Sequence, residues 1–263
     1  MYERAAKTGH YAAAPLLPIW HIDRGRALFV GPLGRNALHA HSVPVYVAGL
    51  NGPIRFRVAG GAWRHLKSAV IPAGVAYEFD AAGDPLAVLY LEPSEAGVEA
   101  LVPLLGAADE TSGALVGAEG PPSVLREVYE ACDGARWVGA AIDDVLGFSG
   151  ARAWGAIDPR IARAIASLAS GREEAAKVAD AAREVGLSAS RFQHLFVDEV
   201  GVPFRRFRLW QRLRAAIGAI AAGSRFTDAA HDAGFFDQAH FARAFRATFG
   251  APATPSLRHV RRG

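Results

Sequence analysis

The sequence predicts an α+β protein of two domains: a β-barrel followed by helices, then an all-α domain with two helix-turn-helix units joined by a long linker helix. Three observations lead to this fold class. Short runs of β-branched and aromatic residues fill the N-terminal part, a helical pattern is repeated in the C-terminal part, and the net charge changes sign between them.

Length and composition set the outer limits. A chain of 263 residues is long enough for two domains that each bury a core, and its single cysteine excludes an internal disulfide. The N-terminal MYERAAKTGH lacks the apolar run of a signal peptide, and no stretch elsewhere is apolar for long enough to span a bilayer. We therefore expect a cytoplasmic protein that does not enter the membrane.

The first domain is predicted over residues 1–150. From about residue 26 to 92, the runs RALFVG, VPVYVAGL, IRFRVA, SAVIPAG and PLAVLYLEP are separated by GPLG, NGP, AGGA and AAGD. This rhythm is typical of a small antiparallel β-sandwich or barrel. From residue 94 the pattern becomes helical in SEAGVEALVPLL, PPSVLREVYEACDG and AAIDDVLGF.

The second domain is predicted over residues 151–263, after a linker at 150–157. Asp158 and Pro159 then occupy the cap and first-turn positions that favour the start of a helix. Residues 1–150 hold 11 Lys and Arg against 16 Asp and Glu, a net charge of −5, whereas residues 151–263 hold 18 against 10, a net charge of +8. A basic C-terminal part suggests a polyanionic partner.

An internal repeat predicts the two helix-turn-helix units, at about 175–201 and 226–250. ADAAREVGLSASRFQHLFVDEVGVP and TDAAHDAGFFDQAHFARAFRATFGAP align, with one additional residue in the turn of the second copy. In each copy, paired alanines allow close helix crossing, a glycine ends the first helix, and phenylalanines anchor the second helix.

The second helix of each unit would present a polar face. Gln and Arg make paired hydrogen bonds to base edges in the major groove, and Arg also suits phosphate. A helical bundle with a solvated polar face is the alternative, and two matched copies in a basic segment favour DNA. The predicted DNA-binding residues are Ser190, Arg191, Gln193 and His194 in the first unit, and Gln238, Ala239, Arg243 and Arg246 in the second.

The segment between the units strengthens the DNA prediction. Residues 203–223 lack an internal proline and predict one helix of about 30 Å. This is close to the roughly 34 Å between major-groove faces on one side of a duplex, so the predicted partner is double-stranded DNA contacted in adjacent major grooves. Four arginines on this helix either touch phosphates or only stabilise its exposed face: Arg205, Arg206, Arg208 and Arg212.

Residues 158–260 resemble the AraC/XylS family of bacterial transcription regulators, most specifically in GFFDQAHFARAFRATFGAPATP. The resemblance implies a homodimer formed through the helices between 94 and 149, for which packing inside the domain is the alternative, with RNA polymerase as a further candidate partner. It also implies base reading by Ser190, Gln193 and His194 and by Gln238, Ala239 and Arg243. Ala239 departs from the family, which usually has a small polar residue there, so the second unit would read fewer bases directly.

GRNALHAHSVPVYVAGLNGPIRFRV and IPAGVAYEF resemble the sensory cupin barrel of many members of this family. His39 and His41 form the H-x-H pair of metal-binding cupins. Val45 and Tyr46 occupy the region where a carboxylate is expected, however, and Tyr77 replaces the second motif's histidine. We therefore predict no metal and no cofactor, and assign His39, His41 and Tyr77 as candidate residues for binding a small-molecule effector.

The sequence thus predicts a DNA-binding transcription regulator that is not an enzyme, with a barrel that senses an effector. Two alternatives remain. One is a cupin enzyme, fused to a DNA-binding domain, that acts through a metal on His39 and His41. The other is a regulator without an effector, whose barrel only dimerises or docks a partner protein.

Overall fold

The structure is a computed structural model that describes residues 16–23, 25–148, 157–169 and 177–261. The segment MYERAAKTGH, the predicted domain boundary at residue 150 and all of the predicted linker except Ile157 lie outside these ranges. Within them, every helix is too short or too polar to cross a membrane.

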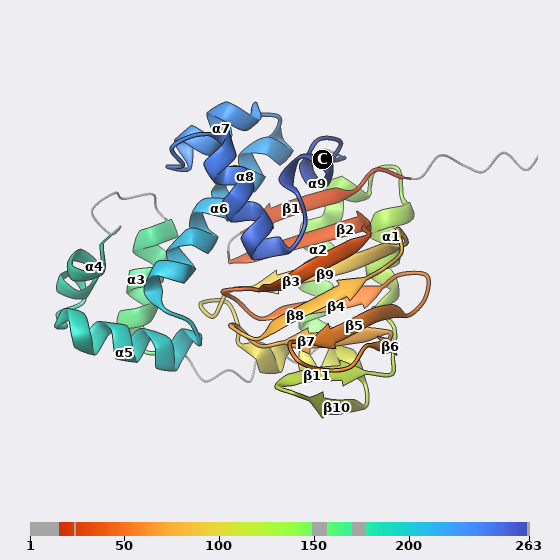
Figure 1. Ribbon diagram of the computed structural model, residues 1–263, viewed down its shortest axis with the longest axis horizontal. Coiled ribbons are helices and arrows are strands. Elements are labelled where there is room, and N and C mark those ends of the chain that lie inside the picture. The colour runs from red at the N-terminus through yellow and green to blue at the C-terminus, as the bar shows by residue number, and fades with distance from the viewer. Residues whose placement is uncertain (1–15, 24, 149–156, 170–176, 262–263) are drawn as a thin grey trace, which may run out of the picture.

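The N-terminal part is built from two antiparallel sheets, as the apolar runs predict (Figure 1). The larger sheet has the order β1-β2-β9-β4-β7-β11-β10, and the smaller has the order β3-β8-β5-β6. The strands are β1 Ile19–Asp23, β2 Arg26–Pro32, β3 Arg35–Ala40, β4 Val45–Gly49, β5 Ile54–Val58, β6 Arg64–Leu66, β7 Ser68–Ile71, β8 Ala76–Asp80, β9 Pro85–Leu91, β10 Ala108–Thr111 and β11 Ala114–Gly117.

The larger sheet is buried on both faces. Its inner face packs against the smaller sheet, and its outer face is covered by α1 (Ser123–Glu130) and α2 (Gly134–Phe148) (Figure 1). Burial on both sides explains why β4 reads as a continuous run, VYVAG, with every residue buried. The described strands form two separate sheets with no hydrogen-bonded strand pair between them. The predicted barrel is therefore a cupin-like sandwich that does not close.

Two elements between the sheets and α1 differ from the prediction. The segment SEAGVEALVPLL forms only two short 3-10 helices, η1 (Val98–Ala100) and η2 (Val102–Leu105), followed by the β10–β11 hairpin. At the hairpin's turn, Ser112 and Gly113 have φ values of 51° and 86°. Two consecutive positive φ angles match the tight turn that suits antiparallel strands, and the Ser-Gly dipeptide was its sequence signal.

The C-terminal part is entirely helical and contains the two predicted helix-turn-helix motifs. Asp158 precedes the first helix and accepts a hydrogen bond from the Arg160 amide at 2.8 Å, as a capping residue does. The helices are α3 Pro159–Ala169, α4 Val178–Glu184, α5 Ala189–Val200, α6 Phe204–Ala222, α7 Phe226–Asp232, α8 Gln238–Phe249 and α9 Ala253–Leu257.

The helical part does not stand apart from the sheets. Helix α6 contacts β1 and helix α8 contacts β3, and buried residues of both parts belong to one continuous hydrophobic core (Figure 1). Four rings meet at this junction, which we call the aromatic cluster: Trp20 and Tyr90 from the strands, and Trp210 and Phe249 from the helices. The relative placement of the N-terminal and C-terminal parts is therefore set by side-chain packing.

Candidate DNA-binding and effector sites

The first helix-turn-helix unit consists of α4 and α5. Ala181 and Ala182 are each 1% exposed where α4 crosses the unit's core, and Gly186 leaves α4 with a φ of 72°. Ser188 caps α5 by accepting a hydrogen bond from the Arg191 amide at 3.3 Å. Phe192 faces inward, so the opposite side of α5 is presented to solvent.

The second unit, α7 and α8, repeats this design. Gly234 has a φ of 77°, and Asp237 caps α8 by accepting a hydrogen bond from the His240 amide at 2.6 Å. Phe241 and Phe245 are at most 1% exposed, which fixes α8 on its apolar side. The paired alanines, the glycine turns and the phenylalanine anchors predicted from the repeat are thus confirmed.

The outward faces of α5 and α8 carry the predicted reading residues. All eight are exposed: Ser190, Arg191, Gln193 and His194 on α5, and Gln238, Ala239, Arg243 and Arg246 on α8. Most of them lie in the N-terminal half of their helix, the end that enters the major groove in helix-turn-helix proteins. Exposed Gln and Arg side chains are of the types that can hydrogen-bond base edges and phosphates.

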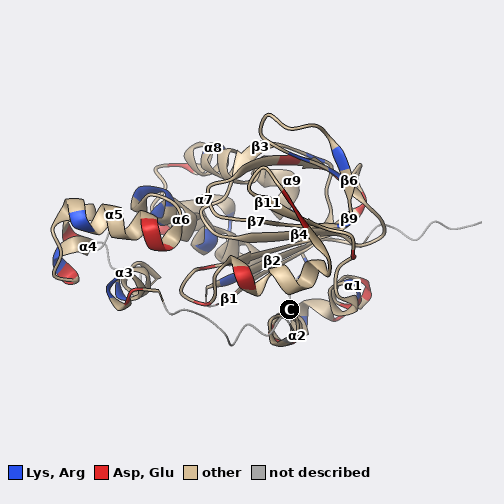
Figure 2. Ribbon diagram, turned by 90° about the horizontal axis from the view of Figure 1, so that it is seen from below, with Lys and Arg blue, Asp and Glu red and all other residues tan. Residues whose placement is uncertain are grey.

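Helix α6 joins the two units without interruption. Its 19 residues correspond to a rise of about 28 Å, in agreement with the predicted linker helix. Several of the basic positions of the C-terminal part lie along it (Figure 2).

Two of the four arginines proposed for phosphate contacts are engaged within the protein. The Arg206 guanidinium donates to the Ala40 carbonyl at 2.7 Å, and Arg212 Nε donates to the Ala233 carbonyl at 2.9 Å. Arg205 is exposed and Arg208 is half-buried. The sequence could not show which arginines are engaged within the protein. The carbonyls that accept their hydrogen bonds lie outside α6, on β3 and in the α7–α8 turn.

Comparison with known proteins agrees with this architecture. The model of a family described as a helix-turn-helix domain matches residues 181–258. This part of the chain is a helix-turn-helix domain. No curated protein sequence matches the chain.

Solved structures of ToxT from Vibrio cholerae share the two-part fold of this chain. The apo form of a ToxT point variant has a TM-score of 0.60 at 13% identity, covering 92% of this chain and 100% of that one. Wild-type ToxT with a bound unsaturated fatty acid has a TM-score of 0.58 at 14% identity, covering 91% and 97%. ToxT bound to (E)-4-(8-methylnaphthalen-1-yl)but-3-enoic acid has a TM-score of 0.57 at 12% identity, covering 89% and 98%.

In this chain, the C-terminal end of α8 is hydrogen-bonded to β3 of the N-terminal part. Asn36 Nδ2 donates to the Phe249 carbonyl at 2.7 Å, and the Ala37 amide donates to the Gly250 carbonyl at 2.9 Å. Both donors lie on β3, where the pairing with β8 shifts register between Asn36 and His39. The second recognition helix is thus anchored to a strand at the end opposite to its reading residues.

A buried ion pair ties α6 to the same junction. Trp210 Nε1 donates to Glu92 Oε1 at 2.9 Å, and the Arg214 guanidinium lies 3.1 Å from the same carboxylate oxygen. The Glu92 side chain is 2% exposed, so it depends on these partners for its charge to be tolerated. Sequence reasoning missed this site, because the three residues share no local motif.

The candidate effector residues form one buried group inside the sandwich. His39 and His41 both point inward, as their spacing of two predicts, with their Nε2 atoms 3.1 Å apart. Tyr77 pairs with His39 across the strands, and its hydroxyl has no hydrogen-bond partner among the described residues. The His41 ring also contacts Phe249, with 5.4 Å between ring centroids.

Burial keeps this pair uncharged. It lowers the pKa of His39 to about 4, against which the backbone hydrogen bond to Ala37 acts only partly. Burial also lowers the pKa of His41 well below its ordinary value, with smaller contributions from His39 and Arg206. Two neutral imidazoles suit hydrogen bonding more than binding of an anion. Within the described ranges, no group of three or more His, Cys, Asp and Glu side chains is arranged to hold a metal ion.

The space between the two histidines and the helical part is nearly filled by side chains. A cavity of about 20 Å³ lies beside the aromatic cluster, lined by Trp20, Tyr90 and Phe249 among others. This is room for about one water molecule. A larger molecule would reach His39 and His41 from this side only by displacing Phe249.

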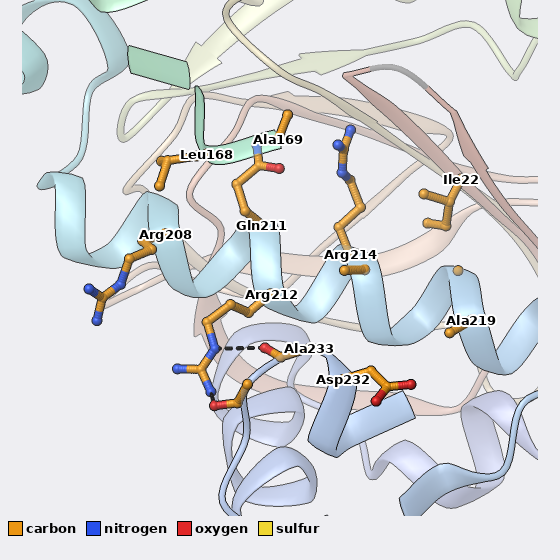
Figure 3. A pocket seen from close by; sticks show the side chains of 13 residues that line it. Ile22, Leu168, Ala169, Arg208, Gln211, Arg212, Arg214, Ala219, Asp232 and Ala233 are labelled. Carbon is orange, nitrogen blue, oxygen red and sulfur yellow. Dashed lines mark hydrogen bonds between the residues drawn. The ribbon is translucent and has the colours of Figure 1, made fainter. Parts of the chain in front are cut away.

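A much larger groove, of about 750 Å³, runs along α6, and we call it the α6 groove (Figure 3). Its walls come from Ile22 of β1, the end of α3, α6 itself and the α7–α8 turn. Gln211 and Arg214 line one side of α6, and Arg208 and Arg212 line the other (Figure 3). Burial, and then the nearby charge of Arg208, lower the pKa of Arg212.

Proposed function

We propose that this protein is an AraC-type transcription regulator that recognises a specific operator by inserting α5 and α8 into adjacent major grooves. The proposal is carried by one observation: all eight predicted reading residues are exposed on two capped helices at the two ends of a 19-residue linker helix. The residues proposed to read or orient on DNA are Ser190, Arg191, Gln193, His194, Gln238, Ala239, Arg243 and Arg246. Arg205 is proposed as a phosphate contact.

Selection of bound fragments from a genomic DNA library, followed by a binding assay on the enriched sequence, tests this proposal. The wild-type protein is expected to enrich a site with two recognition segments about one helical turn apart. Lys67→Ala, an exposed change between β6 and β7, controls for loss of positive charge outside the reading helices and the proposed dimer interface. Enrichment of no sequence, or equal loss of binding in Arg243→Ala and Lys67→Ala, would count against sequence reading by α8.

We further propose that residues 1–150 form a sensor and dimerisation domain and residues 151–263 the DNA-binding domain. The apolar residues of α1 and α2, such as Leu125 and Ile142, pack on the outer face of the larger sheet. A homodimer formed through these helices would therefore use their outward faces, where Asp143 and Asp144 are exposed. Light scattering at increasing protein concentration, compared between wild type and an Asp144→Arg variant, tests this interface.

Control by a small-molecule effector is proposed on two grounds. ToxT, which shares the fold, has been solved with an unsaturated fatty acid and with a butenoic acid, and both are carboxylic acids with apolar bodies. In this chain, an effector at His39, His41 and Tyr77 would displace Phe249 and so release the end of α8 from β3. That release would couple sensing to the placement of the second recognition helix.

The α6 groove is a second candidate effector site. Arg208 has no hydrogen-bond or ion-pair partner in the described part of the chain, and the buried Gln211 side-chain nitrogen is likewise unpartnered there. Small residues, Ala215, Gly218 and Ala219, continue the groove beyond these polar groups. The charged group of an anion could bind Arg208 and Gln211, and its apolar body could pack along the small residues. Such a ligand would contact α6 and the α7–α8 turn together.

Thermal shifts with decanoate and 1-decanol distinguish the two sites. Decanoate is expected to raise the melting temperature more than the uncharged alcohol. Loss of that difference in Arg208→Ala would assign the α6 groove, whereas loss in a His39→Asn, His41→Asn double variant would assign the sandwich. Equal responses to acid and alcohol in all three proteins would argue against recognition of an anion at either site.

We propose that the regulator is not an enzyme and that activation of transcription would involve contact with RNA polymerase. The competing hypothesis of a metal-dependent cupin enzyme rests on His39 and His41, which are two ligands where such a site needs at least three. Elemental analysis of protein purified without a metal-affinity tag tests it. One tightly held ion per chain, lost in the double histidine variant, would favour the enzyme.

A further inference from the structure

The turn of the second helix-turn-helix unit contains a phenylalanine that the first unit lacks. Gly186 aligns with Gly234 at an offset of 48, whereas Phe192 aligns with Phe241 at an offset of 49, so one residue is inserted between them. Gly234 is followed by two phenylalanines, Phe235 and Phe236. Phe235 is 2% exposed and Phe236 is 89% exposed, so the inserted side chain is the outward one.

Phe235 occupies the inward position of the turn. Its ring lies 5.4 Å from that of Phe241 and 4.3 Å below the Arg212 guanidinium. Arg212 also donates hydrogen bonds to the carbonyls of Ala233 and Gly234. The turn is therefore held from α6, and Phe236 cannot rotate into the core without expelling its neighbour.

The other end of the turn is fixed as well. The Asp237 side chain caps α8, and the Phe236 amide donates to the His240 ring at 3.4 Å. Because both ends of the turn are fixed, the Phe236 side chain stays exposed to water. It adds no hydrophobic free energy to folding, since it is as hydrated in the folded state as in the unfolded state. A position of this kind is suited to a contact made in a complex.

The neighbours of Phe236 identify the partner. It lies two residues before Gln238 and three before Ala239, at the N-terminal end of the helix that reads the major groove. Arg243 and Arg246 are exposed on the same helix, and the adjacent Asp237 carboxylate is engaged as the cap of α8. The one apolar group on a major-groove edge is the C5-methyl of thymine, and Phe236 and Ala239 are the exposed apolar side chains at this end of α8.

We propose that Phe236 contacts a thymine methyl in the operator, and that with Ala239 it gives the second unit a preference for thymine. The inference rests on the proposed sequence-specific DNA binding and adds a specificity-determining residue outside the recognition helix itself. A protein partner on the same spot would block Gln238 and Arg243 from DNA, so DNA is favoured over a docking protein.

The test uses the full-length protein and the sequence enriched by the wild type. Each thymine in the segment bound by the second unit is replaced in turn by deoxyuridine, which removes only the methyl group. The wild type is expected to lose about fourfold in affinity at one or two positions, the equivalent of ~0.8 kcal/mol for one buried carbon. Phe236→Ala is expected to bind the thymine site more weakly and to be indifferent to deoxyuridine at those positions.

Matched variants separate this effect from general damage. Phe236→Leu keeps an apolar side chain and should retain part of the sensitivity to the methyl group. Leu17→Ala removes another exposed apolar side chain, 49% exposed ahead of β1, and should leave affinity and deoxyuridine sensitivity unchanged. Equal melting temperatures for wild type and Phe236→Ala would show that the turn still folds.

Two results would overturn the inference. One is a Phe236→Ala protein that keeps wild-type affinity and wild-type sensitivity to deoxyuridine. The other is a variant that changes only self-association or polymerase binding. Failure of the proposed function is recognised separately, because it appears already as the absence of any sequence enriched by the wild-type protein.

Discussion

Gly250 ends α8 in a left-handed conformation with a φ of 69°, and its counterpart in the first unit, Gly201, ends α5 with a φ of 82°. A side chain at either position costs about 1 to 2 kcal/mol for the left-handed backbone. At Gly201 an added Cβ would meet its nearest atom, the Ala73 Cβ, at an ordinary 3.4 Å. At Gly250 the same atom would lie 2.4 Å from the Ala37 carbonyl oxygen and 2.6 Å from His39 Nδ1.

Gly250→Ala must therefore push the end of α8 away from β3. The hydrogen bonds from Asn36 to Phe249 and from Ala37 to Gly250 would be lost, at about 1 kcal/mol each. We expect Gly201→Ala to destabilise the protein by about 1 to 2 kcal/mol and Gly250→Ala by about 3 to 4 kcal/mol. For a chain of this size, the difference of ~2 kcal/mol corresponds to roughly 4 to 8 °C in melting temperature.

Calorimetry on the two variants measures this difference, and hydrogen exchange locates it. The Ala37 amide, which is protected by the Gly250 carbonyl, should exchange faster in Gly250→Ala and stay protected in Gly201→Ala. Equal melting temperatures, or an unchanged Ala37 amide in both variants, would refute the claim that the end of α8 is held against the sensor.

Three further outcomes are expected. Arg243→Ala should weaken operator binding by about 1 to 3 kcal/mol and relax the preference at one base. Arg205→Ala should weaken binding to all sequences and reduce the slope of log binding constant against log salt concentration by about 1. Competition assays at several salt concentrations measure both effects. Because the pKa of His39 falls from 6.5 in the unfolded chain to about 4, His39 contributes about 3 kcal/mol of stability that is present above pH 6.5 and is lost as the pH falls towards 4, and His39→Asn should remove this share of the pH dependence in urea titrations. Trp210→Phe should cost about 2 kcal/mol in the same titrations, because a buried carboxylate loses a hydrogen bond, and no loss would mean that its charge is otherwise satisfied.

Local periodicity accounts for what the sequence predicted well. The phenylalanines at Phe192 and Phe241 follow from helical spacing, and the positive φ at Gly186 and Gly234 follows from the repeat. The inward direction shared by the two barrel histidines follows from the period of a strand. Whether the outward residues read bases stays a prediction.

What the sequence did not reveal depends on contacts between distant positions. Asn36 and Phe249 are 213 positions apart, and nothing near either residue signals their hydrogen bond. Arg206 belongs to an arginine-rich helix face and looks like its neighbours, yet its guanidinium donates to the Ala40 carbonyl at the end of β3. The filling of the space above His41 by Phe249 likewise follows from docking of the two parts, which no local pattern encodes.

The register shift in β3 takes Ala37 out of the pairing with β8, and its amide binds the Gly250 carbonyl instead. The irregular strand and the glycine at the end of α8 therefore form one contact, although they lie far apart in the sequence. A chimaera that takes its N-terminal part from a relative would contain only one of the two segments that form this contact. Functional chimaeras of this protein should require that residues 35–39 and residues 249–250 be exchanged together, which gives a design rule for rewiring its response.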